Sequence, residues 1–480
     1  MNFRMIIYLL GVILLLVSAL LLLPMLTALA FSESILPFAI TIFIGLIVAL
    51  PIVRLKPKDT RIYSKEGFIT VASAWILLSL FGALPFVISG AIPNYIDAFF
   101  ETVSGFTTTG ATIIESFDGI SRSVHLWRTL THWIGGMGVL VFMLALIPSA
   151  GGQAIYLMRA EVPGTDKGKL VPKMRQSALI LYGIYVALTL LEIVSLLIAG
   201  LSFYDSAVVS LSTAGTGGFA VFGDSILGYA NPAAEWIIAI FMFIFGVNFN
   251  MYFLLLLGNF KRVFKNEELR IYTAICLSSV LVICLNNHAL YSSLSDCIRA
   301  SFFQVTSIMS TTGFVTANYM EWGTLSQVLL VALMFIGACA GSTAGGFKIS
   351  RFLIAVKSAF RELRHVRRPN SVNTVRLEGN VVKEESVRAV GSYMCIYVIV
   401  LALSTLSISV FDSFGFETNF SVAFSTLNNV GPALGSVGAF GNIASYSYFS
   451  KIILSFNMLF GRLEMIPMLI LFSPRTWKRG

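Results

Sequence analysis

The chain has 480 residues, of which 56% are apolar and 12% are charged, and its mean hydropathy is +0.84. This composition excludes a soluble globular core and is typical of a protein that crosses a membrane several times. The formal net charge of +9 does not indicate nucleic-acid binding, because the Lys and Arg residues gather in short loops between apolar runs. The five cysteines are odd in number and lack CxxC spacing, and the four histidines are scattered, so neither disulfides nor a metal or catalytic cluster is indicated.

Two long apolar runs, at 5–31 and 35–53, open the chain and predict a helical hairpin in the membrane. The first run is longer than the apolar region of a signal peptide, which spans roughly 7–15 residues. The segment 54–67 after the hairpin is rich in Lys and Arg, so we expect it on the cytoplasmic side. Residues 1–66 are therefore predicted to form a transmembrane hairpin with a cytoplasmic loop.

From Gly67 onward one plan occurs four times: an apolar helix, a shorter segment that ends in a glycine motif, and a second apolar helix. Such repeats determine the architecture, and we expect them at 67–177, 178–270, 271–385 and 386–480. The second helices, which return across the membrane, are expected at 125–147, 233–257, 325–360 and 448–472. The loops between repeats and both chain ends are basic, which predicts ten spans and two cytoplasmic termini. The predicted fold is an all-α membrane protein with four helix–pore loop–helix repeats around one pore.

The glycine motif reads SGFTTTGAT from Ser104, STAGTGGFA from Ser212, SIMSTTGFV from Ser307 and STLNNVGPA from Ser425. Each copy has a glycine six residues after its serine, and glycine permits a sharp turn and the close approach of another backbone. Four such backbones around an axis predict a ring of carbonyl oxygens that replaces the hydration shell of a monovalent cation. We predict that the ion binds at the four glycines, within a filter of Thr108, Thr109, Gly110, Thr216, Gly217, Gly218, Thr311, Thr312, Gly313, Asn429, Val430 and Gly431.

The segment before each motif is too short to cross about 30 Å of hydrocarbon, and an acid stands near its start: Asp97, Asp205, Asp296 and Glu417. An acid that caps a helix favours the helix dipole, so each short helix would direct its partly negative end at the filter. The alternative is an ordinary re-entrant cap without an ionic role. The Thr and Asn side chains beside the glycines either offer oxygens to the ion or, as we prefer, brace the loop while the backbone coordinates.

The third return segment contains GACAGSTAGGFK at 337–348, and each glycine costs about 1 kcal/mol in a helix interior. We expect this run to break the helix, whereas close helix packing through small residues is the alternative. Because few side-chain contacts would hold such a segment, we expect it to move easily. The predicted gate consists of Gly337, Gly341, Ser342, Thr343, Gly345, Gly346, Lys348 and Arg462.

Arg462 lies in the last apolar helix, where a cation is costly and marks a functional site. Glu464 is two residues further along and points to another face, so Arg462 should face the pore or an acid elsewhere. A structural ion pair is the alternative for Arg462. Glu192, in the middle of another apolar run, is interpreted as a structural partner.

Four helix–loop–helix units with single filter glycines resemble the superfamily of the TrkH, KtrB and plant HKT potassium transporters, and the hairpin at 5–53 resembles the TrkH branch. Some HKT members that favour sodium have serine where this chain has Gly110, so the resemblance implies K⁺ as the transported ion. It also implies that 337–348 lies under the filter, that Arg462 raises a barrier to cations, and that the chain is a homodimer in a bacterial inner membrane. The chain itself has no Walker or GxGxxG phosphate loop, so any control by nucleotide must come through a partner. The resemblance implies a TrkA-like nucleotide-binding subunit docked on the basic cytoplasmic loops.

The leading interpretation is potassium uptake through one chain, with the segment 337–348 drawn aside by the cytosolic subunit. The alternative is a secondary transporter that couples a solute or K⁺ to H⁺ or Na⁺, since such folds place broken helices and buried charges at the midplane. Those folds usually show two inverted repeats, however, and this chain shows four parallel ones. An enzyme is not supported, because paired acids, a His cluster and a nucleophile motif are missing from the sequence.

Overall fold

The computed structural model describes residues 1–59, 62–138, 174–370, 373–463 and 465–474. This part of the chain is a bundle of helices, and its two short strands, β1 (Arg376–Leu377) and β2 (Asn380–Val381), form an antiparallel hairpin. Three further segments are short 3₁₀ turns: η1 (Ser225–Tyr229), η2 (His288–Leu290) and η3 (Tyr319–Glu321). The predicted all-α membrane fold is confirmed.

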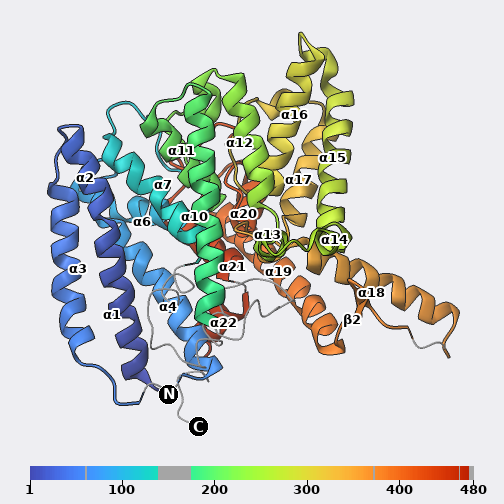
Figure 1. Ribbon diagram of the computed structural model, residues 1–480, viewed down its shortest axis with the longest axis horizontal. Coiled ribbons are helices and arrows are strands. Elements are labelled where there is room, and N and C mark those ends of the chain that lie inside the picture. The colour runs from blue at the N-terminus through green and yellow to red at the C-terminus, as the bar shows by residue number, and fades with distance from the viewer. Residues whose placement is uncertain (60–61, 139–173, 371–372, 464, 475–480) are drawn as a thin grey trace.

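The predicted N-terminal hairpin is present at one side of the bundle (Figure 1). It consists of α1 (Phe3–Leu20), its continuation α2 (Leu22–Ala30), and α3 (Leu36–Arg54). Helix α1 packs against α3 and against the first helix of the first repeat, while α2 packs against α7 of that repeat. The hairpin therefore stands outside the fourfold part of the fold and contacts it through the first repeat.

The outgoing helix of each repeat is long and continuous apart from a small break in the first. These helices are α4 (Ser64–Gly82) with α5 (Leu84–Ile88), α10 (Met174–Ile198), α15 (Glu267–Asn287) and α19 (Glu384–Phe411). Within the described residues six helices are long and apolar enough to cross a membrane, or seven if one bent pair is a single span. The number of ten spans stays a prediction, because interrupted return helices are too short to count as single long apolar helices.

The four return helices differ from the expected straight rods. They are α7 (Arg122–Gly136), the pair α12 (Pro232–Phe245) and α13 (Phe249–Leu256), the pair α17 (Thr324–Ile336) and α18 (Ile349–Arg367), and the pair α21 (Tyr448–Leu463) and α22 (Met465–Phe472). The break between α17 and α18 confirms the predicted interruption at 337–348. The rest of the expected first return helix, up to residue 147, lies outside the described residues, as do Glu464 and the basic segment 159–173.

The predicted single helix at 233–257 was wrong, because α12 and α13 meet at an angle of 91°. The break has a local cause: Asn248 caps α13 by accepting a hydrogen bond from the backbone N–H of Asn250 (2.9 Å). A Cβ atom on Gly246 would lie 2.3 Å from the Tyr272 hydroxyl, so this position also requires a residue without a side chain. A short helix, α14 (Phe260–Lys265), follows and leads into α15.

Four short helices lie between the outgoing and return helices: α6 (Tyr95–Phe106), α11 (Phe203–Gly215), α16 (Leu294–Met309) and α20 (Phe416–Asn428). Each packs against the return helix of the preceding repeat in cyclic order, with α11 on α7, α16 on α12, α20 on α17 and α6 on α21. The cycle closes from the fourth repeat back to the first. The four repeats therefore surround one axis, and the C-terminal ends of the short helices meet near it.

Candidate functional site

Each of the four short helices ends in the same hydrogen-bonded turn, in which the serine of the motif takes part through its backbone carbonyl. The residue two positions before each glycine has a left-handed backbone, with φ of 55° to 57°, at Thr108, Thr216, Thr311 and Asn429. The next N–H then bonds to the serine carbonyl five residues earlier, with N···O distances of 2.9 Å for Thr109 to Ser104, 3.0 Å for Gly217 to Ser212, 2.8 Å for Thr312 to Ser307 and 3.0 Å for Val430 to Ser425. This is a Schellman-type helix end, and it explains the serine-to-glycine spacing.

Beyond these turns the four glycines close into a ring. A Cβ atom placed on any of them would collide with a carbonyl oxygen of the next motif. The pairs are Gly110 with Gly217 (1.9 Å), Gly218 with Thr312 (2.1 Å), Gly313 with Val430 (2.1 Å) and Gly431 with Thr109 (2.5 Å). The last pair returns to the first motif, so the backbones of all four repeats approach one another around a common axis. The glycines are required both by this contact and by positive φ angles of 77°, 80°, 82° and 98°.

A cavity of about 300 Å³ opens directly on this ring. Its lining includes all four ring glycines together with the residues that follow them, such as Ala111, Ala220 and Val315. Glu115 and Arg128 also reach it. The four glycines that the sequence motif predicts to share one site therefore do lie together. Their role in binding K⁺ stays a prediction.

Several of the Thr and Asn side chains beside the ring form hydrogen bonds with protein groups. Thr109 bonds to the Thr107 hydroxyl (2.8 Å), and Thr312 bonds to the Ser310 hydroxyl (2.6 Å). The Asn429 amide donates to Thr109 Oγ1 (3.0 Å) and to the carbonyl of Met458 (2.8 Å). These contacts support bracing by Thr109, Thr312 and the Asn429 amide nitrogen, whereas Thr108 Oγ1 and Asn429 Oδ1 have no hydrogen-bond partner in the described part of the chain. Within the described residues no group of three or more His, Cys, Asp or Glu side chains is arranged to hold a metal ion.

The starts of the short helices carry the expected acids in the first turn, but neighbouring residues provide the caps. Asn94, Ser202 and Ser293 accept the backbone N–H bonds, and Gly415 precedes α20. At the start of α16, outside the candidate spans, the Ser293 hydroxyl and then Arg299 lower the pKa of Asp296 below its ordinary value. That acid is therefore ionised at neutral pH and complements the positive end of the helix dipole.

His132 of α7 supports the second motif, and this role of His132 was not predicted from the sequence. Its Nδ1 lies 2.7 Å from the carbonyl oxygen of Gly105, and its Nε2 accepts the backbone N–H of Phe219 (3.2 Å). The ring stacks on Phe219 with a centroid distance of 4.1 Å. A Cβ atom on Gly217 would lie 2.2 Å from the imidazole, so this glycine leaves room for His132. The two hydrogen bonds fit a neutral imidazole protonated on Nδ1.

A buried ion pair lies within the first repeat beside the ring, and it was also missed. The guanidinium of Arg128 lies 2.8 Å from the carboxylate of Glu101, and both side chains are at most 1% exposed. Glu101 also accepts the backbone N–H of Ile113 (3.0 Å), while Arg128 donates to the carbonyl of Ala220 (3.1 Å). The pair thus fixes the backbone just after the first and second ring glycines.

The segment 337–348 lies directly beneath the ring. The backbone N–H of Gly345 donates to the hydroxyl of Thr311 (2.7 Å), and a Cβ atom on Gly345 would lie 2.8 Å from the Cβ of Asn429. Both ring residues belong to left-handed turns of the motif. The segment therefore contacts the third and fourth repeats at the point where the ring ends.

The expectation that few contacts hold this segment was wrong. Most of its residues are buried, and hydrogen bonds tie it to neighbouring helices on several sides. The Glu268 carboxylate accepts the N–H groups of Ala340 (2.7 Å) and Ser350 (3.1 Å) at the two ends of the segment. The break between α12 and α13 supplies further partners, with Cys339 N–H bonded to Gly246 O (3.1 Å) and Phe249 N–H bonded to Gly341 O (3.0 Å).

The two basic residues of the predicted gate are both inside the protein. Lys348 is only 1% exposed, and its ammonium donates to the carbonyl of Ala344. Arg462 donates to the carbonyl of Thr343 (2.7 Å) and to those of Gly135 (2.6 Å) and Gly136 (2.8 Å) at the end of α7. Arg462 therefore links the fourth repeat to the segment and to the first return helix.

Comparison with known proteins gives consistent results at the levels of sequence and structure. A sequence model of the TrkH family, described as a cation transport protein, matches residues 36–479. The chain is 37% identical to the Trk system potassium uptake protein TrkH of Salmonella typhimurium and 36% identical to that of Escherichia coli K12, and both alignments cover all of each chain. The crystal structure of the potassium transporter TrkH from Vibrio parahaemolyticus matches with a TM-score of 0.89 and 32% identity over all of both chains.

Proposed function

Since this chain belongs to the TrkH family of cation transport proteins, we propose that it takes up K⁺ across a bacterial inner membrane through the ring of its four glycine motifs. The resemblance stated from the sequence is confirmed, and so is the expectation that the chain is not an enzyme, because its relatives are potassium uptake proteins. The proposal keeps the predicted division into a hairpin at 1–66 and repeats that begin at 67, 178, 271 and 386. Both termini lie in the cytoplasm in this arrangement.

The observation that carries the proposal is the cyclic contact of each ring glycine with a carbonyl of the next motif. A backbone without side chains at four equivalent points leaves carbonyl oxygens as the groups that face the axis. Such oxygens replace the hydration shell of K⁺ in selectivity filters. The bracing of Thr109, Thr312 and Asn429 by other side chains supports this role, since it holds the carbonyls in place without occupying them.

The proposed gate is the segment 337–348 together with Arg462. Its position against Thr311 and Asn429 lies on the path that an ion would take after the ring. The guanidinium of Arg462 adds a positive charge there, and a unit charge at a few ångströms in low dielectric repels a cation by several kcal/mol. Opening requires that the Glu268 carboxylate release the N–H groups of Ala340 and Ser350, and that Arg462 release the carbonyl of Thr343.

The proposed partner is a TrkA-like nucleotide-binding subunit that docks on the basic cytoplasmic surface, and the proposed assembly is a homodimer. Helix α18 projects sideways from the lower end of the bundle (Figure 1), and it leads directly from the segment 337–348 to the basic residues after Phe360. Nearby, Arg262, Lys265 and Arg270 line a surface hollow of about 670 Å³ and form no salt bridge within the described residues. Unpaired cations of this kind favour an acidic docking surface.

The experiment that tests the proposal is uptake of radioactive Rb⁺ into liposomes that contain the chain together with its cytosolic subunit. We expect Rb⁺ uptake that K⁺ inhibits strongly and Na⁺ inhibits weakly. Liposomes that take up no Rb⁺, or in which Na⁺ competes as well as K⁺, would contradict the proposed function.

Coupling of K⁺ to H⁺ is a second candidate, and Glu192 favours it. This residue of α10 is fully buried, and neither carboxylate oxygen has a hydrogen-bond partner within the described residues. The hydroxyl of Thr213 lies near it but donates to the carbonyl of Val209 (2.9 Å). Glu192 was interpreted as a structural partner, but no described residue is bonded to its carboxylate. A bound proton would neutralise this buried carboxylate most simply. A pH gradient that alters Rb⁺ uptake by the wild type and by the exposed-loop control Asp224→Asn, but not by Glu192→Gln, would support coupling.

A further inference from the structure

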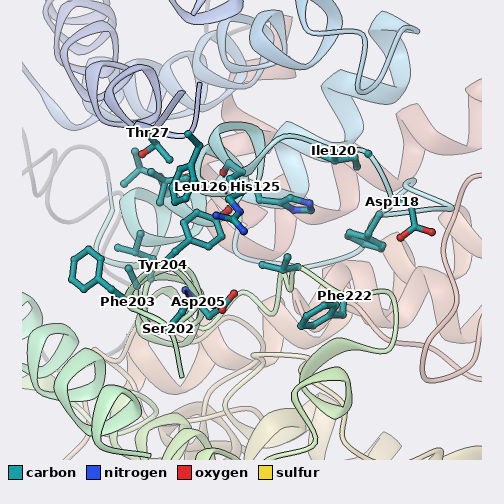
Figure 2. Close-up of a pocket in the computed structure, with 18 of the residues that line it drawn as sticks. Thr27, Asp118, Ile120, His125, Leu126, Ser202, Phe203, Tyr204, Asp205 and Phe222 are labelled. Atoms are coloured by element: carbon teal, nitrogen blue, oxygen red, sulfur yellow. Dashed lines mark hydrogen bonds between the residues drawn. The ribbon is translucent and has the colours of Figure 1, made fainter. Parts of the chain in front are cut away.

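A second cavity, of about 1420 Å³, lies away from the ring between the N-terminal hairpin and the first two repeats. Figure 2 shows Thr27 of α2, His125 and Leu126 of α7, and Tyr204 and Asp205 of α11 around this space. None of the ring glycines lines it. The cavity therefore belongs to a different site from the one described above.

The inner part of the cavity is apolar and has the depth of one membrane leaflet. Its walls there include Leu26 of α2, Leu130 and Trp133 of α7, and Leu211 of α11. Along α7 the lining extends from Arg122 to Trp133, which corresponds to about 16 Å at 1.5 Å per residue. Half of a hydrocarbon core of about 30 Å is nearly the same length. A hydrocarbon chain inserted from the level of Arg122 would thus reach the end of the cavity near the middle of the bilayer.

The outer end of the cavity carries charges of both signs. The guanidinium of Arg122 lies 4.4 Å from the ring centre of Phe31 and 5.6 Å from that of Tyr204. These rings hold it in place, and its side chain forms no hydrogen bond or salt bridge within the described residues. Four acids also line the cavity: Glu115, Asp118, Asp205 and Asp224. Figure 2 shows Asp205 beside Ser202 and Tyr204, and Asp118 on the other side of the space. Asp205 is fixed by the hydroxyl of Ser202 (2.6 Å).

We propose that this cavity binds one zwitterionic phospholipid with an ammonium headgroup, such as phosphatidylethanolamine, from the adjacent leaflet. The phosphate lies on the free N–H groups of Arg122, because guanidinium binds phosphate oxygens in a planar, bidentate manner. The ammonium faces Asp205, which follows Tyr204 beside Arg122, and an acyl chain lies along α7 toward Trp133. The presence of one cation, Arg122, among four acids selects a zwitterionic headgroup over an anionic one.

The test compares two tryptophan substitutions on the same helix. Leu26 lines the cavity and is 57% exposed, whereas Leu29 is 56% exposed and does not line it. Leu26→Trp fills the space, and Leu29→Trp adds the same bulk to the outer face of α2. The proteins are purified in detergent without added lipid, and bound phospholipid is counted by native mass spectrometry and identified after extraction.

We expect wild type and Leu29→Trp to retain one phosphatidylethanolamine per chain and Leu26→Trp to lose it. Arg122→Gln adds no bulk and decides the question if Leu26→Trp fails to fold. It should weaken retention about tenfold, as expected for the loss of one charge-assisted contact. Equal lipid in all variants, detergent alone in the wild type, or an anionic phospholipid in place of phosphatidylethanolamine would overturn the proposal.

Discussion

Replacement of Gly110 by serine tests the ring most directly, because the structure separates its two effects. The backbone φ at Gly110 is +77°, and a residue with a Cβ atom in this left-handed conformation destabilises the fold by about 1–2 kcal/mol. The new Cβ atom would also lie 1.9 Å from the carbonyl oxygen of Gly217. Since ordinary C···O contacts are about 3.3 Å or longer, that carbonyl would have to move by more than about 1 Å.

A displaced carbonyl contributes less to ion coordination, and a hydrogen bond to a charged group is worth roughly 1.5–3 kcal/mol. A loss of about 1.4 kcal/mol for K⁺ relative to Na⁺ lowers the preference about tenfold. We therefore expect Gly110→Ser to reduce the ratio of Rb⁺ to Na⁺ uptake by at least that factor. The corresponding change at Gly431 should be the mildest of the four, because its Cβ atom would lie 2.5 Å from the nearest carbonyl oxygen.

The matched control is Gly90→Ser, on an exposed loop. Gly90 has the same φ of +77°, and a Cβ atom there would have no neighbour within 4 Å, so this variant carries the backbone strain without the collision. Uptake of radioactive Rb⁺ and Na⁺ into liposomes measures the ratio for both variants. If Gly110→Ser and Gly90→Ser keep the same ratio as the wild type, the contact between Gly110 and Gly217 does not shape the filter.

Three further perturbations concern the gate and the support of the ring. Arg462→Ala removes hydrogen bonds to Gly135, Gly136 and Thr343 together with a positive charge, so Rb⁺ uptake without the cytosolic subunit should rise at least about tenfold; a folded variant with wild-type uptake would leave Arg462 a purely structural role. Deletion within 341–346 should give high uptake that no longer responds to the subunit, and low, responsive uptake from an assembled protein would place the gate elsewhere. Glu101→Gln leaves Arg128 buried without its carboxylate and should destabilise the protein by about 3–5 kcal/mol. Glu267→Gln, in the partly exposed pair with Lys357, should cost at most about 1 kcal/mol, and equal shifts in thermal unfolding would refute this difference.

The features that sequence reasoning found are local in the chain. Apolar runs and glycine motifs recur within each repeat, so the four units and the break at 337–348 follow from short stretches of residues. The break at 246–248 was missed because one glycine and one asparagine hardly lower the hydropathy of that run. Asn248 is nevertheless a recognisable helix cap, and attention to capping residues inside apolar segments would have found it.

The features that were missed join residues far apart in the sequence. Glu101 and Arg128 are separated by 27 positions and come from different helices of one repeat. His132 reaches Phe219, and Glu268 reaches Ala340, across repeats. Each of these residues is a polar side chain in an apolar stretch, which marks it as significant, but a single sequence does not show its partner. For the same reason the segment 337–348 was expected to be loosely held, although its partners come from four neighbouring helices.

The fourth motif differs from the others in placing asparagine, not threonine, at the left-handed position of the turn. Asn429 reaches Thr109 of the first repeat and Met458 of its own return helix, and it lies beside Gly345. In a tetramer of identical subunits, any such substitution would appear at all four points around the axis at once. Here the four quarters are encoded separately on one polypeptide, so the fourth quarter carries asparagine where the other three carry threonine, and 337–348 contacts one quarter of each kind. A single chain thus allows mutation to assign different tasks to symmetric positions, one codon at a time.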